Sequence, residues 1–177
     1  MMPHKHSALG LPFFITVTIL LTSCAVPPYD EKMDNQVTEL QQSMDSGLGE
    51  IEGYSFFYEQ LSKNANAGKD AIEAARKKCS YESNYKFYND TEASINTLLV
   101  RISVTPSVPQ GPVNSITSIQ KDFLSLRDMH ATHIPCLKSV NFTVKRKQLT
   151  GDFYPIYSYL LQTKVGVSES GSPKDSK

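Results

Sequence analysis

The sequence predicts an all-α protein, an up-down-up-down helical bundle of about four main helices. Three observations lead to this prediction. Apolar residues recur every three or four positions over most of the chain, alternation of period two is scarce, and turn-forming residues gather in a few short tracts. Amphipathic helices joined by short connections favour an antiparallel bundle.

The first predicted helix begins near Asp30 and extends to about Leu61. Its apolar positions form a single stripe, made of Met33, Val37, Leu40, Met44, Leu48, Ile51, Tyr54, Tyr58 and Leu61. Gly47, Gly49 and Gly53 each weaken the helix by up to about 1 kcal/mol relative to alanine, so its middle is where it could bend or break. The tract 63–68 has the composition of the following turn.

The second helix changes phase at Cys79. Its early stripe (Ile72, Ala75 and Cys79) is out of register with a later one that contains Tyr81, Tyr85, Tyr88, Ile95, Leu99 and Ile102. We therefore expect a kink or a new helix start at Cys79. The segment 100–104, VRISV, fits a strand or a helix end equally well, and the proline-rich tract 105–112 predicts a connection.

The third helix is predicted to be capped by Asn114 or Ser115 and to stop before Pro135. Its inward positions are Ile116, Ile119, Phe123, Leu126 and His130. The fourth begins near Ser139 and is kinked or split at Pro155, with Phe142, Leu149, Phe153, Ile156 and Leu160 on one side. Residues 30–165 would thus form one bundle domain, followed by a disordered tail over 166–177.

The N-terminus has the pattern of an export signal. Residues 1–7 contain Lys5 and no acidic residue. They precede an apolar stretch from Ala8 to Leu21, which is too short to span a bilayer comfortably and is followed by small residues. Its last residues, Leu21-Thr22-Ser23-Cys24, resemble the lipobox of bacterial lipoprotein precursors. An ordinary secretory signal with a chance cysteine and an uncleaved anchor are the alternatives.

The resemblance implies that residues 1–23 are cleaved off and that Cys24 carries fatty acyl chains such as palmitate. Several acyl chains hold a protein firmly on a membrane. The tether 24–29, with Pro27 and Pro28, reaches only about 3.3 Å per residue, which keeps the folded part within roughly 20 Å of the lipid. Ala25, where an aspartate would resemble the inner-membrane pattern, implies the outer membrane and a body facing the periplasm.

The other two cysteines, Cys79 and Cys136, are expected to form a disulfide. The second and fourth helices run in the same direction in such a bundle, so their N-terminal ends share one end of the molecule. An exported protein enters an oxidising compartment. Closing this loop stabilises the fold by about 4 kcal/mol in the chain-entropy model. Two separately buried thiols are the alternative.

A zinc site is a further alternative at the same place. His130, His133 and Cys136 are spaced three apart, and Cys79 would complete a set of suitable ligands. Two observations argue against this site: Pro135 interrupts the helix before the third ligand, and oxidation competes for both thiols. In addition, histidines near a helix C-terminus interact favourably with the helix dipole, which gives them a role without a metal. We therefore predict no metal and no cofactor.

Composition and motifs favour a non-enzymatic protein. The chain holds 18 basic and 18 acidic residues, and this balance argues against nucleic-acid binding. The run Lys145-Arg146-Lys147 is read as a solvated helix face, with a nucleic-acid or lipid-headgroup role as the alternative. The chain also contains no Gly-x-Ser-x-Gly elbow and no phosphate-binding loop. Its glycine-rich segment lacks the preceding strand that a dinucleotide-binding fingerprint requires.

The leading hypothesis is a lipid-anchored helical module that binds an unidentified protein partner or supports envelope structure. A competing hypothesis is a module that encloses a small apolar ligand at an aromatic end, and a third is a metal-dependent or other catalytic role of His130 and His133. Aromatic residues of this kind fill cores or form binding surfaces. The candidate binding residues are Tyr54, Phe57, Tyr58, Tyr81, Tyr85 and Tyr88.

Overall fold

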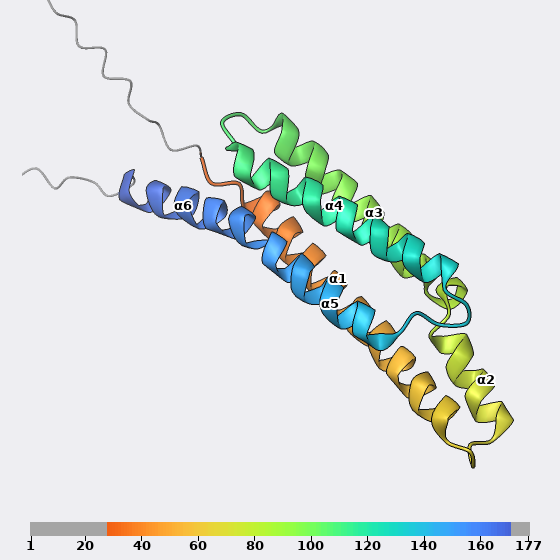
Figure 1. Ribbon diagram of the computed structural model, residues 1–177. Coiled ribbons are helices and arrows are strands. Elements are labelled where there is room, and N and C mark those ends of the chain that lie inside the picture. The colour runs from red at the N-terminus through yellow and green to blue at the C-terminus, as the bar shows by residue number, and fades with distance from the viewer. Residues whose placement is uncertain (1–27, 171–177) are drawn as a thin grey trace, which may run out of the picture.

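The computed structural model describes residues 28–170, and this part of the chain is an all-α bundle without strands. Four rods lie side by side in an elongated molecule (Figure 1). The first is α1 (Glu31–Lys63), the second α2 (Lys69–Lys78) followed by α3 (Tyr81–Val104), the third α4 (Gln110–Thr132), and the fourth α5 (Ser139–Asp152) followed by α6 (Tyr154–Ser170).

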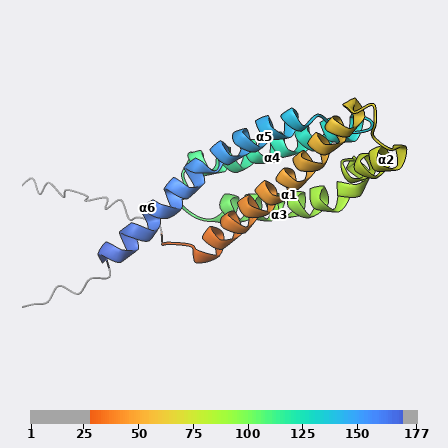
Figure 2. The same ribbon diagram turned by 90° about the horizontal axis from the view of Figure 1, so that it is seen from below.

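The rods alternate in direction, which confirms the predicted bundle. α1 packs against α2, α3 and α5, while α4 packs against α3, α5 and α6. α3 contacts neither α5 nor α6, so the second and fourth rods are diagonally opposite each other. The first residues of α1 and the end of α6 lie at one end of the molecule, and α2 lies at the other (Figure 2).

α1 is continuous over 33 residues, about 50 Å at 1.5 Å per residue. The carboxylate of Asp30 caps it by accepting the Met33 backbone N–H at 2.9 Å. The helix does not break at Gly47, Gly49 or Gly53, where the sequence would allow a break. Residues 33–51 of the predicted apolar stripe are buried, and packing of this face against three neighbours offsets the low helix propensity of glycine.

Two of the glycines provide room for neighbouring side chains. A Cβ added at Gly47 would lie 2.1 Å from the Phe87 ring of α3, a distance that no packed side chain adopts. At Gly49 the same atom would lie 3.3 Å from the Arg146 guanidinium of α5. Both residues allow a close approach between helices, whereas Gly53 faces open space.

The two predicted breaks divide the second and fourth rods. α2 ends at Lys78, and α3 begins at Tyr81 after Ser80, whose hydroxyl accepts the Ser83 N–H. α5 ends at Asp152, and α6 restarts at Tyr154, which places Pro155 in the first turn, where a missing N–H costs no hydrogen bond. The segment 100–104 is the helical end of α3.

Two predicted boundaries are wrong. α4 begins at Gln110 and not after a cap at Asn114 or Ser115, because Pro112 falls in its first turn, where backbone N–H groups have no partner within the helix. α6 continues to Ser170, so the first residues of the predicted tail 166–177 are helical.

The core is a continuous apolar cluster along the bundle axis. It contains all the apolar inward positions predicted for α4 and for the fourth rod, and the predicted inward residue His130 is buried against Phe142 of this cluster. None of the helices between residues 28 and 170 combines the length and apolar character that crossing a bilayer requires. The predicted signal peptide, 1–23, lies outside the described residues, as do Cys24 and most of the tether.

Candidate functional site at the disulfide end

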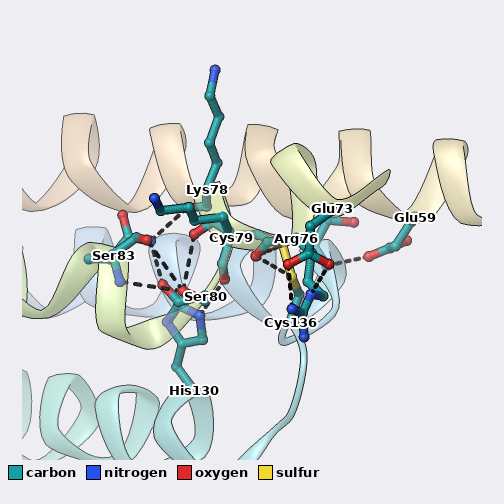
Figure 3. The surroundings of a disulfide bond; sticks show 12 residues. Glu59, Glu73, Arg76, Lys78, Cys79, Ser80, Ser83, His130 and Cys136 are labelled. Atoms are coloured by element: carbon teal, nitrogen blue, oxygen red, sulfur yellow. Dashed lines mark hydrogen bonds and ion pairs between the residues drawn. A yellow bond between two sulfur atoms is a disulfide. The ribbon is translucent and has the colours of Figure 1, made fainter. Parts of the chain in front are cut away.

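The loop after α2 and the loop before α5 meet at one end of the bundle. There the structure joins Cys79 and Cys136 by a disulfide, with their Cα atoms 5.5 Å apart (Figure 3). Cys79 is fully buried, while Cys136 is half-buried in the loop that connects α4 to α5. A thiolate therefore has access to the bond only from the side of Cys136.

A buried hydrogen-bond chain lies directly beneath this disulfide. His130 of α4 points toward the junction between α2 and α3 (Figure 3), and its Nε2 lies 2.8 Å from the carbonyl oxygen of Cys79. A carbonyl only accepts, so Nε2 carries the proton, and Nδ1 accepts the Tyr88 hydroxyl at 2.8 Å. This chain connects α3, α4 and the disulfide loop.

Burial sets the protonation of this pair. Removal from water lowers the pKa of His130 below its usual value and raises the pKa of Tyr88. His130 is therefore neutral at neutral pH, and both of its ring nitrogens are engaged. It has no nitrogen left for a substrate proton or a metal ion.

The arrangement does not support the zinc alternative or a catalytic role of the histidines. The Nδ1 of His133 donates to the carbonyl of Met129 in its own helix, at 2.7 Å, and its ring is exposed. The disulfide occupies both thiols. Over residues 28–170, no three His, Cys, Asp or Glu side chains are grouped closely enough to hold a metal ion.

The six candidate aromatic residues separate into core and surface. Tyr88 is fully buried, and Tyr81 packs over it with ring centroids 5.5 Å apart. Tyr85 and Phe57 are exposed. Tyr54 and Tyr58 are half-buried on α1, and the Lys78 ammonium lies 5.4 Å from the centre of the Tyr54 ring. These residues do not form a single binding surface.

A pocket of about 260 Å³ opens beside the disulfide. Charged side chains form much of its lining, among them Glu73, Arg76 and Lys77, together with Tyr81 and Ile134. Ile134 is 87% exposed and projects from the loop before Pro135. A pocket with this charged lining is poorly suited to enclosing a small apolar molecule, which prefers a mostly hydrophobic cavity.

The basic run 145–147 is not a free cationic patch. Lys145 pairs with Asp122 of α4 at 3.0 Å, and Arg146 bridges Asp45 and Glu52 of α1 at 2.8 Å each. Lys147 is exposed. Although burial acts to raise the pKa of Glu52, hydrogen bonds from Thr143 and Arg146 hold it below its usual value. Two of the three cations thus hold α5 against its neighbours.

Sequence reasoning missed a groove of about 410 Å³ between α1 and α5. Gly49 and Gly53 line it on the α1 side, where they add no side chain, and exposed Phe56 and Val140 border it. Phe56 and Val140 are far apart in sequence, and neither belongs to a buried stripe. Spacing within one helix therefore contained no signal that they border the same groove.

Comparison of the chain with protein families, with curated proteins and with solved structures finds no match.

Proposed function

We propose that this protein is a bacterial lipoprotein held at the periplasmic face of the outer membrane, where it acts without catalysis as an interaction or envelope-structural module. The observation that carries the proposal is the apolar stretch that ends in Leu21-Thr22-Ser23-Cys24. Acylation of Cys24 places the bundle next to the lipid, since the tether reaches only about 20 Å.

Two features of the described residues support this proposal. The pairing of Cys79 with Cys136 suits an exported protein, because a disulfide persists in an oxidising compartment. The long bundle also exposes large apolar side chains, and two of them, Phe56 and Val140, line the same groove between α1 and α5. Exposed apolar side chains that gather into patches mark interaction surfaces.

Mass spectrometry of the N-terminal peptide, from protein purified from the membranes of its natural host, tests the anchor. We expect a chain that begins at Cys24 and carries acyl groups. The matched variant Cys24→Ala should keep its leader and carry none. An unmodified Cys24, or a native chain that retains residues 1–23, would overturn the proposal.

The interaction role has its own experiment. A photo-crosslinking residue at exposed Phe57 should join the native protein to a specific partner in cells, whereas the same residue at buried Phe123 should not. If the residue at position 57 gives no more cross-linked product than the residue at position 123, the proposed role in protein binding is wrong. The proposal of a lipid anchor is unaffected by that result.

A further inference from the structure

The fourth rod has an apolar stripe on its solvent side, which we call the outer stripe. Five exposed side chains on α5 and α6 form it, namely Val140, Val144, Tyr154, Leu161 and Val165. Together with Lys147, Gly151 and Ser158 they repeat at alternating intervals of four and three residues from 140 to 165. That spacing keeps them on one face of a helical rod.

The outer stripe lies on the side of α6 that faces away from the core. The buried residues of α6 include Ile156, Leu160 and Thr163, and Leu161 and Val165 lie about half a turn away from them at 100° per residue. α6 is thus apolar on two opposite sides. Within the described chain, α1, α4 and α5 cover only its inner side.

The charge of this rod suits an anionic surface. Lys164, which packs over Tyr29, is the sole charged residue between Asp152 and Glu169, and exposed Lys147 is the one charged position in the repeat from 140 to 165. No acidic side chain belongs to the stripe. Anionic lipid headgroups attract a cation such as Lys147, and tyrosine is enriched at the boundary between lipid and water, where exposed Tyr154 would lie.

The position of the chain entry connects this stripe with the membrane. Tyr29 packs beside α6, with the Lys164 ammonium 5.2 Å from the centre of its ring. α6 extends past the first turn of α1 at the same end of the molecule (Figure 2). Cys24 precedes Tyr29 by five residues, so an acylated Cys24 lies within about 20 Å of α6. A helix is about 10 Å across, so a modest tilt brings its outer side to the lipid.

We infer that the outer stripe lies flat on the phospholipid surface in which Cys24 is anchored, with Tyr154, Leu161 and Val165 entering the headgroup region. This inference rests on the proposed function, because the acyl anchor brings the rod to the bilayer. Anchoring removes most of the entropic cost of the second contact, so a modest apolar stripe is sufficient. The diagonally opposite α3 then faces away from the membrane.

The chain contains no tryptophan, so a single introduced tryptophan reports on one position. The variants are Leu161→Trp and Val144→Trp on the outer stripe and Val100→Trp on α3. Leu161 is 63% exposed and Val100 is 62% exposed, so the two positions are matched before any membrane contact. Each variant is purified in its lipidated form and reconstituted into vesicles of phosphatidylethanolamine and phosphatidylglycerol with brominated acyl chains.

We expect bromine to quench the tryptophans at 161 and 144 several-fold more strongly than the tryptophan at 100. Circular dichroism controls for folding, and flotation of the vesicles controls for attachment. If the floating protein shows equal quenching at 161 and 100, the outer stripe does not face the lipid, although the anchor stands.

Two other results would also overturn the inference. Absence of quenching at 161, together with cross-linking of the outer stripe to a second copy, would assign it to a protein interface. If mass analysis finds that Cys24 carries no acyl chains, the anchor and the inference fall together.

Discussion

At the scale of single residues, the best-defined feature is the buried link from Tyr88 through His130 to the carbonyl of Cys79. A buried polar group is tolerated only when its hydrogen bonds are made, and both nitrogens of His130 are satisfied. The link therefore fixes one tautomer of the histidine and holds α4 against the disulfide loop. Its role is structural.

This link predicts a pH dependence of stability. His130 has a lowered pKa in the folded protein, whereas in the unfolded chain it titrates near 6.5. Below that pH the unfolded state binds more protons, so the free energy of unfolding should fall as pH decreases from about 6.5 toward the folded pKa. The slope approaches about 1.4 kcal/mol per pH unit.

Urea unfolding across this pH range measures the effect. His130→Gln should be less stable and should lack this part of the slope, whereas the matched variant His133→Gln, at an exposed position, should retain it. A slope in His130→Gln equal to that of the native protein would show that other groups cause it.

At the scale of the elements, α1 shows how packing overrides propensity. The helix runs unbroken through three glycines because two of them admit Phe87 and Arg146 from neighbouring rods. Arg146 reaches Asp45 and Glu52 from the same position, so the close contact between α1 and α5 also satisfies charge.

Alanine substitutions along α1 should therefore have opposite effects. Gly53→Ala meets no neighbour and should raise the free energy of unfolding by about 0.5 to 1 kcal/mol through helix propensity. Gly47→Ala drives a methyl group into the Phe87 ring and should lower it by about 1 to 3 kcal/mol.

Urea unfolding of both variants, each compared with the native protein, provides the measurement. If Gly47→Ala is as stabilising as Gly53→Ala, the close approach of α1 and α3 at this residue is incorrect.

At the scale of the whole molecule, one covalent bond spans half of the bundle. The disulfide joins two cysteines that are 57 residues apart in the sequence. The loop that it closes contains all of α3 and α4. The bond therefore restricts the unfolded chain strongly, while in the folded state it joins loops that the topology already brings together.

Removing this bond should cost about 4 kcal/mol of stability in the chain-entropy model. The double variant Cys79→Ala, Cys136→Ser should unfold at a lower urea concentration than the oxidised protein, and adding reductant to the native protein should reproduce most of that loss. Thiol titration should find both cysteines blocked before reduction. An unchanged unfolding midpoint would show that the bond adds little to the fold.

Much of the fold follows from local patterns in the sequence. The phase slip at Cys79 and the proline at 155 marked the two breaks, and the inward positions of α4, including His130, are all buried. The start of α4 was misplaced because a proline is as compatible with a first helical turn as with a loop. The helical part of the tail was missed because polar residues at a helix end carry little periodic signal.

By itself, the sequence determined which segments are helical, apart from the start of α4 and the end of α6, and which of their faces are apolar, because helical hydrogen bonds and the 3.6-residue repeat act within a few residues. Only the tertiary structure decided which side chains meet across rods, namely His130 with Tyr88, Arg146 with Asp45, and Phe87 with Gly47. It also decided which of two apolar faces of α6 remains uncovered. Such contacts depend on how whole helices are rotated and shifted against one another. That arrangement is determined jointly by residues that are far apart in the sequence.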